Sequence, residues 1–346
     1  MKLRPILFSA VFLLILFVFT ELLLRLALLF YGYPFFRPSD YIYKGFYKEL
    51  EPIAQADIQR DDSTKKILIL GGSVVSSPWA HMEDRLDTIL QKNYPGGGKF
   101  AIYNAALAGH TSLDNRIKYD LLDQQRFDLV LYYEAINETR ANNIPPDKFR
   151  ADYSHFKWYS DIYLLQAHPE INFTVIPYLI HKVYRYAEDA LTRREYISQE
   201  KVVEDYVKYG QDIKTAASFD KNLTDIIQTA RRRGDKLMIM TYASYFPKDV
   251  QLSGEEEDMQ HYAGCYFACA ISIWGKPEYV KKGIAAHNEI TRELASRYQV
   301  TLMPMAQRMP PDSSLFCDVC HVSELGAQYF AHQLAGFIGE KRLLSK

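Results

Sequence analysis

Residues 65–73 read KKILILGGS, a short apolar run that ends in two glycines and a serine. Such a run is typical of a strand that is covered on both faces of a parallel sheet. Glycines at its end permit a sharp turn, which would present Ser73 at the carboxyl edge of the sheet. The stretch therefore predicts an α/β fold with a candidate nucleophile at its first strand-to-helix turn.

Apolar runs and helical stretches alternate along the rest of the chain. Further strands are expected at residues 100–107, 128–133, 236–242 and 300–305, and helices at 82–92, 114–125, 177–194, 220–233 and 279–298. This alternation predicts a parallel sheet with helices on both sides. Active sites of such sheets lie at the carboxyl ends of the strands, where Ser73, Gly109 and Asn137 would all fall.

The first thirty residues have a different character. Lys2 and Arg4 precede a run at residues 6–19 that is apolar except for one serine, and the apolar character resumes after Glu21. Because roughly twenty residues span a bilayer, we expect a membrane helix whose far end carries Glu21 and Arg25, one turn apart and able to pair and to reach toward headgroups. A cleaved signal peptide is the alternative, although no small-x-small cleavage site follows the apolar run.

Basic residues before the apolar segment favour a cytoplasmic N-terminus and an extracytoplasmic, periplasmic location for the remainder. We expect a membrane anchor at residues 1–34, a stalk at 35–64 and one catalytic domain at 65–346, with a helical insertion around 140–218. A formal net charge of −1 over 346 residues gives no basic surface for phosphates, so no nucleic-acid partner is expected.

A serine near the start of the domain and an aspartate and a histidine near its end are the residue types needed for nucleophilic catalysis. A serine hydroxyl is a poor nucleophile until an imidazole removes its proton, and a carboxylate fixes the tautomer of that imidazole. Ser73, His321 and Asp318 supply these groups, with Asp318 three residues before the base. The N–H groups of Ser73 and Gly109 and the side-chain amide of Asn137 are the candidate oxyanion donors.

The order of these blocks resembles that of the SGNH (GDSL-type) hydrolase superfamily. The blocks are Gly71-Gly72-Ser73, residues 104–112 with Gly109, residues 135–138 with Asn137, and residues 318–321 followed by Gly326. The resemblance spans residues 65–340. It implies a flavodoxin-like three-layer α/β/α fold, a Ser73/His321/Asp318 triad and an oxyanion hole from Ser73, Gly109 and Asn137, with no metal or organic cofactor.

The sequence departs from the family pattern at three positions. Gly72 stands where an Asp usually precedes the nucleophile, and Ala135 and Glu138 stand where the asparagine block usually has Gly and Asp. None of these changes removes a catalytic group. The methyl group of Ala135 is expected to narrow the site or to shift the choice of substrate.

The four cysteines admit several interpretations. Residues 317–321 read CDVCH, the pattern of c-type haem attachment, and Cys265, Cys269, Cys317 and Cys320 together have spacings near those of a four-thiolate zinc site. Disulfides are favoured in an extracytoplasmic domain, and four cysteines allow three pairings. A bridge from the region of residues 265–269 to the catalytic loop would fix Asp318 and His321.

The chain is thus expected to be a membrane-anchored serine ester hydrolase that acts on an extracytoplasmic acyl ester. The resemblance suggests O-acetyl groups of envelope polysaccharide, or lipid acyl esters, as substrates. Two other functions stay open at this point. One is an O-acyltransferase that uses the same triad with a sugar hydroxyl as acceptor, and the other is a non-catalytic carbohydrate-binding or assembly protein of the same fold.

Overall fold

The computed structural model describes residues 3–61, 63–93, 98–198 and 202–344. The chain forms two compact units, each of which draws on two separate parts of the sequence. The first unit comprises residues 1–51 and 154–196, and the second comprises residues 52–153 and 197–346. The expected division of the sequence at residues 34 and 64 stays a prediction.

The second unit is built on a five-stranded sheet in which all paired strands are parallel. Its strands are β1 (Thr64–Gly71), β2 (Lys99–Asn104), β3 (Leu129–Tyr133), β4 (Lys236–Met240) and β5 (Thr301–Met303). Their spatial order is β2-β1-β3-β4-β5, which is the flavodoxin-like order. The predicted three-layer α/β/α fold is confirmed, and all five strands lie where apolar runs predicted them.

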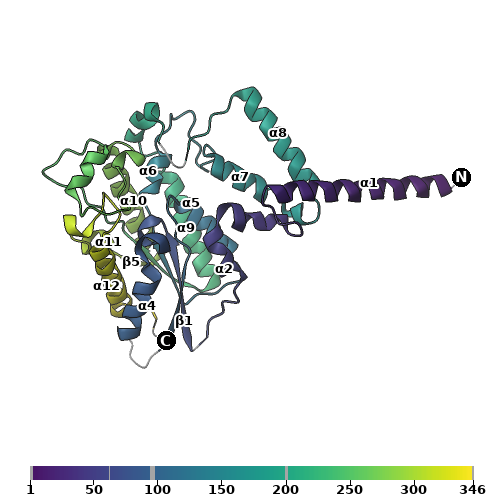
Figure 1. Cartoon of the computed structure of the whole chain (residues 1–346). Helices are drawn as coiled ribbons and strands as arrows, with labels where there is room; N and C mark the ends of the chain where they lie inside the picture. Colours follow the sequence, from purple (N-terminus) through teal and green to yellow (C-terminus); the bar gives the residue numbers. More distant parts are fainter. Residues whose placement is uncertain (1–2, 62, 94–97, 199–201, 345–346) are drawn as a thin grey trace. The chain divides into compact units, whose positions relative to one another are not determined.

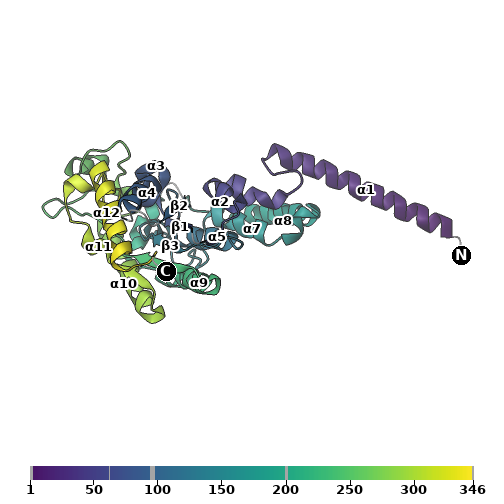
Figure 2. The same cartoon turned by 90° about the horizontal axis from the view of Figure 1, so that it is seen from below.

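Helices cover both faces of this sheet, as Figures 1 and 2 show for the second unit. On one face α4 (Met82–Asn93) packs against α12 (Glu324–Glu340), and on the other α5 (Ser112–Leu121) and α10 (Pro277–Tyr298) pack against α9 (Ala216–Arg233). Short helices complete the unit: α2 (Glu51–Gln55), α3 (Ser77–Ala80), α6 (Asn137–Ala141) and α11 (Met305–Arg308).

Both faces of the central strands are buried, which explains why these strands are apolar throughout. Ile67 and Ile69 of β1 pack in one core with Leu86 of α4 and Phe330 of α12, while Leu68 points to the other face and is equally buried. Loss of apolar surface to the two helical layers stabilises the sheet at about 25 cal/mol per Å² buried. The carboxyl ends of β1 and β3 are thereby held rigidly, and the candidate catalytic residues follow them.

The first unit contains three long helices. They are α1 (Leu3–Phe30), α7 (Lys157–Gln166) and α8 (Ile176–Thr192), of which α7 and α8 are consecutive in the chain apart from a 3-10 turn at Pro169–Asn172. Residues 4–30 of α1 are long and apolar enough to cross a membrane. The predicted pairing of Glu21 and Arg25 is confirmed, because Arg25 Nε donates to Glu21 Oε1 at 2.7 Å.

The expectation that Glu21 and Arg25 reach toward lipid headgroups is wrong. Both residues are only 8% exposed, and the protein itself takes up their polar atoms. Arg25 donates to the carbonyl oxygens of Phe35 and Asn172, at 2.8 and 3.0 Å. An ionised pair without water needs such further partners, so the last turns of α1 are bound into the first unit.

Candidate active site

Ser73 lies directly after β1 and begins a 3-10 turn. The preceding Gly71 has no room for a side chain, since a Cβ there would lie 2.6 Å from Tyr133 O. Ser76 closes the turn, because its N–H and its hydroxyl both donate to Ser73 O, at 3.0 and 2.8 Å. The two glycines and Ser76 thus present the Ser73 side chain at the carboxyl edge of the sheet.

Asp318 and His321 lie on one closed loop between β5 and α12. An antiparallel bridge pairs Phe316 with Val322 at the base of the loop, and Cys317 N donates to His321 O at 2.7 Å. The separation of Asp318 from His321 is therefore set by the loop itself.

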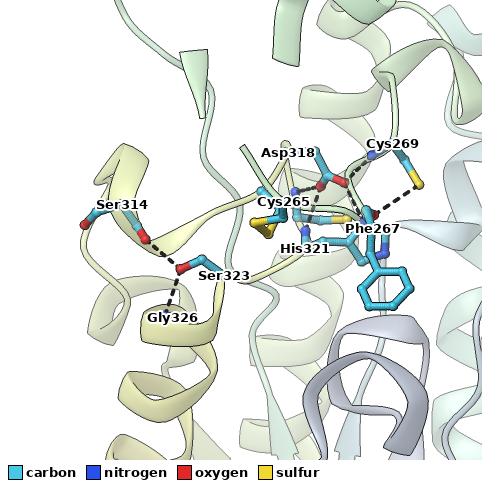
Figure 3. The surroundings of a disulfide bond; sticks show 10 residues. Cys265, Phe267, Cys269, Ser314, Asp318, His321, Ser323 and Gly326 are labelled. Atoms are coloured by element: carbon cyan, nitrogen blue, oxygen red, sulfur yellow. Dashed lines mark hydrogen bonds and ion pairs between the residues drawn. A yellow bond between two sulfur atoms is a disulfide. The ribbon is translucent and has the colours of Figure 1, made fainter. Parts of the chain in front are cut away.

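Hydrogen bonds at the start of α12 fix the end of this loop. Ser323 is the N-cap: its hydroxyl accepts from Gly326 N at 3.0 Å and donates to Ser314 O at 2.6 Å (Figure 3). A side chain at position 326 would overlap Leu315 O, which explains the glycine there.

The structure brings Ser73, His321 and Asp318 together in one hydrogen-bonded chain. Ser73 Oγ lies 2.7 Å from His321 Nε2, and His321 Nδ1 lies 2.6 Å from Asp318 Oδ2. All three residues are buried. A neutral imidazole that donates from Nδ1 to the carboxylate leaves Nε2 free to accept the serine hydroxyl, which is the tautomer that general-base catalysis requires.

The Asp318 carboxylate has an unusually full set of donors for a buried group. Besides His321 Nδ1, it accepts from the N–H groups of Cys320, His321 and Cys269, at 2.8, 2.7 and 2.9 Å (Figure 3). Burial opposes its charge, but His321 and these hydrogen bonds hold the pKa of Asp318 below its ordinary value.

The pKa of His321 moves in the opposite direction. Burial disfavours the imidazolium, but Cys320, the charge and hydrogen bond of Asp318 and the contact with Cys269 all act the other way, and the pKa of His321 is raised well above its ordinary value. Cys320 would add to this effect only as a thiolate, and burial raises the pKa of that thiol to about 12. Asp318 therefore makes His321 a stronger base.

Two tryptophans contact the His321 ring, and neither was found by sequence reasoning. Trp79 stacks on it with ring centroids 4.1 Å apart and 18° between the planes, and Trp274 lies 5.7 Å away at 47°. Aromatic faces attract cations, so this packing favours the imidazolium that forms when His321 takes a proton. Isolated tryptophans 195 positions apart carry no sequence signal that would have placed them together.

Asn137 and Gly109, the other candidate oxyanion residues, follow β3 and β2. Trp274 Nε1 donates to Asn137 Oδ1 at 3.3 Å, and Asn137 Nδ2 donates to His110 O at 3.0 Å, so both contacts fix the orientation of the amide. Gly109 has a φ of +78°, which favours glycine. Among the described residues, the N–H groups of Ser73 and Gly109 have no acceptor.

A buried glutamate that sequence reasoning missed fills the space beside Gly72. A Cβ at position 72 would overlap Glu134 Oε2 and lie 3.0 Å from Asn137 Nδ2. Glu134 Oε1 accepts from Asn137 N at 2.8 Å, whereas its Oε2 is buried without a partner in the described part of the chain. Burial raises the pKa of Glu134 to about 8, with the nearby Glu138 adding to the shift.

Glu138 joins the glycine and asparagine blocks. Its Oε1 accepts from Ser112 N at 2.6 Å, and its Oε2 accepts from the Tyr153 hydroxyl. Burial raises the pKa of Glu138 despite these bonds. The longer side chain at this position, noted as a departure from the family pattern, thus reaches the loop that carries Gly109.

Cys265 and Cys317 form a disulfide, which ties the loop at residues 265–269 to the loop that carries Asp318 and His321 (Figure 3). Cys320 is a buried free thiol and Cys269 a partly exposed one. With Cys265 and Cys317 joined, neither haem attachment through Cys317 nor a four-thiolate zinc site has its full set of thiols. Of the pairings left open by the sequence, the structure has one bridge, between Cys265 and Cys317, and leaves Cys269 and Cys320 as thiols.

One group of side chains has the composition of a metal site. Cys269, Asp318 and His321 each offer one ligand atom, and these atoms lie within 4.8 Å of one another. Asp318 Oδ2 already bonds His321 Nδ1, and His321 Nε2 already bonds Ser73 Oγ. A cation at these residues would therefore compete with the serine and the proton of His321.

Comparisons with known proteins were made with the sequence and with the structure. No protein-family model matches the chain, and no curated protein matches it. Its structure is similar to a lipase/acylhydrolase from Enterococcus faecalis, at 12% identity over 80% of this chain and 96% of that one, with a TM-score of 0.44. An acetylxylan esterase from Geobacillus stearothermophilus matches at 12% identity, 81% and 97% coverage and a TM-score of 0.43.

A GDSL-like lipase from Bacteroides thetaiotaomicron matches at 12% identity over 87% of this chain and 97% of that one, with a TM-score of 0.43. Because these TM-scores are below 0.5, the fold assignment rests on the strand order β2-β1-β3-β4-β5. The chemistry of the site rests on the contacts among Ser73, His321 and Asp318.

The contact between Gly72 and Glu134 predicts that the usual family residue is not tolerated at position 72. Gly72→Asp forces its side chain into the Glu134 carboxyl and should lower the free energy of unfolding by about 1–3 kcal/mol, as overpacking does. Glu134→Ala in the same chain removes the clash and should restore part of that loss. Thermal melts of the two single variants and the double variant measure this coupling, and additive losses would contradict it.

The disulfide should stabilise the catalytic loop. Reduction, or replacement of both Cys265 and Cys317 by Ser, should lower the free energy of unfolding by about 2–4 kcal/mol, because the bridge restrains the unfolded chain. The measurement is a thermal melt with and without reductant, with the double Ser variant as the control that reductant no longer affects. A melt indifferent to reductant in the parent protein would refute the assignment.

The raised pKa of His321 gives a definite pH dependence. Only neutral His321 accepts the serine proton, so kcat/KM for a simple ester should rise with pH through an apparent pKa above the ordinary 6.5 and fall as pH drops through it. Asp318→Asn should move that apparent pKa down and slow the reaction by about 10³–10⁴-fold. If Asp318→Asn does not change the apparent pKa of kcat/KM, a group other than His321 controls the pH dependence.

Proposed function

We propose that this chain is a membrane-anchored serine ester hydrolase whose catalytic unit acts outside the cytoplasm. The observation that supports it is the unbroken chain of hydrogen bonds from Ser73 Oγ through His321 to Asp318, with distances of 2.7 and 2.6 Å. A serine placed on an imidazole that is itself placed on a carboxylate is the arrangement that activates a hydroxyl.

The reaction begins when Ser73 Oγ attacks the ester carbonyl carbon and its proton passes to His321 Nε2. Charge that develops on the carbonyl oxygen is stabilised by the N–H groups of Ser73 and Gly109 and the second N–H of Asn137 Nδ2. The imidazolium is stabilised by Asp318 and by the stacked Trp79. His321 then donates its proton to the departing alcohol, which leaves an acyl-enzyme.

Water completes the reaction by attack on the acyl-enzyme carbonyl carbon. His321, neutral again, takes a proton from the water and returns it to Ser73 Oγ as the carboxylic acid leaves. These side chains, the backbone N–H donors and water together complete both halves of the reaction.

Two features support an extracytoplasmic location. The apolar helix α1 carries Arg4 at its start, which favours a cytoplasmic N-terminus. The Cys265–Cys317 disulfide suits an oxidising compartment. An acyl ester of the cell envelope, on a polysaccharide or a lipid, is the substrate class that an enzyme tethered in this way would meet.

The first test is fluorophosphonate labelling of the detergent-solubilised full chain, with the adduct located by peptide mass spectrometry. Labelling confined to Ser73 is expected, and Ser73→Ala and His321→Ala should each lower ester turnover by several orders of magnitude, about 10⁴-fold or more. Ser314→Ala is the matched control, since Ser314 lies near the loop and, within the described part of the chain, bonds through its carbonyl to Ser323 and through its amide and hydroxyl to Asp312.

The outcomes separate the functions that share this fold. Full turnover by either triad variant would end the proposal. Labelling of Ser73 with slow hydrolysis, accelerated only by an added sugar hydroxyl, would show an O-acyltransferase instead. A folded protein that is not labelled and binds glycans equally well as Ser73→Ala would be a binding protein.

A further inference from the structure

Helix α8 of the first unit carries an apolar stripe on its outer side. Positions 180, 183, 184, 187 and 191 recur at the spacing of one helical face. The stripe consists of Ile180 (66% exposed), Val183 (68%), Tyr184 (65%), Leu191 (86%) and the exposed Ala187. We call this set the outer stripe.

Three of the four charged side chains of α8 point the other way, into the unit, whereas Glu188 is exposed at the border of the outer stripe. Arg185 pairs with Asp161, and Asp189 accepts from the Tyr196 hydroxyl at 2.8 Å. Lys182 lies over the Tyr33 ring at 5.4 Å. A helix on a water-exposed surface has its apolar side inward and its charges outward, so the polarity of α8 is reversed.

The start of α8 is hydrogen-bonded to α1. Both carboxylate oxygens of Glu21 accept from Val175 N, at 2.9 and 3.1 Å, and one also accepts from the Thr174 hydroxyl at 2.9 Å. Arg25 donates to Asn172 O at 3.0 Å. Within the first unit, α8 leaves this junction at a steep angle to α1 (Figure 1).

The length of α1 gives the depth of this junction. From Arg4 to Glu21 the helix rises about 26 Å at 1.5 Å per residue, close to the roughly 30 Å hydrocarbon core of a bilayer. Leu22, Leu23 and Leu26 remain 45–50% exposed beyond that point, and Phe173, next to the junction, is 92% exposed. Apolar surface thus continues from α1 to the beginning of α8.

We propose that the outer stripe of α8 lies in the interfacial layer of the same phospholipid bilayer that α1 crosses. The inference rests on the membrane anchoring of α1 in the proposed function and goes beyond it, because it gives the first unit a second contact with the membrane. An interfacial helix lies in the plane of the membrane with its apolar side among the acyl chains. Acyl chains around the outer stripe would explain why the apolar side of α8 faces outward.

The test uses the full chain reconstituted in phosphatidylcholine vesicles that contain a photoactivatable lipid. One lipid carries its diazirine near the headgroup and a second carries it at the end of an acyl chain, and labelled peptides are identified by mass spectrometry. The lipid with its diazirine near the headgroup should label the tryptic peptide at residues 186–193 about tenfold more than it labels peptides of α9. The lipid with its diazirine at the end of an acyl chain should label residues 5–25 of α1.

A matched pair of variants checks that the stripe is responsible. The triple variant Val183→Ser/Tyr184→Ser/Leu191→Ser should lower labelling of α8 by the headgroup diazirine about tenfold. Labelling of α1 by the acyl-chain diazirine should not change. Leu325→Ser, which removes a 55% exposed leucine from α12, should change neither. Circular dichroism verifies that the variants are folded.

Labelling of α1 without labelling of α8 above the α9 level would overturn this inference and leave the anchor intact. Absence of label on both helices would overturn the anchor and the inference together. A third result, in which α8 is protected because two copies associate, would appear as a dimer by mass photometry in nanodiscs and would also overturn it. Ester turnover and Ser73 labelling are independent of all three results.

Discussion

The site depends on one constraint, which is that a carboxylate without water must find its donors in the protein. Asp318 is 1% exposed and satisfies this need with His321 Nδ1 and three backbone N–H groups. Two of these N–H groups belong to its own loop and one to Cys269. The charge of Asp318 therefore folds its loop, joins it to the neighbouring loop and orients the base, all through one side chain.

A comparison with the other buried carboxyl groups of the unit shows what these donors achieve. Glu134 accepts from Asn137 N through one oxygen, its second oxygen is unpartnered among the described residues, and its pKa rises to about 8. Glu138 has two donors and also has a raised pKa. Asp318, equally buried, keeps a lowered pKa because it has twice as many donors as Glu138, with His321 Nδ1 among them. Only the ionised carboxyl lies next to the base.

The sequence was sufficient for features that follow from local pattern. Apolar runs located all five strands, because strands covered on both faces must be apolar, and the chemistry of Ser73, Asp318 and His321 identified groups that the fold does bring together. It was insufficient where a contact joins distant residues of ordinary type. The space beside Gly72 is filled by Glu134, and His321 is stacked by Trp79; in both cases the partner is set by the approach of two loops, which no spacing encodes.

Charged side chains are also buried in the first unit, where apolar side chains are exposed instead. Glu21 and Arg25 pair inside the protein near the end of an apolar helix, and three of the four charged side chains of α8 also turn inward while its apolar stripe faces out. In water this arrangement would be unfavourable in two ways, because the apolar stripe would be exposed to water and the charged groups would be buried away from it. In a bilayer both costs reverse, because lipid solvates the apolar stripe and only protein can satisfy the charges. The arrangement of side chains is thus evidence about the solvent in which the unit folds.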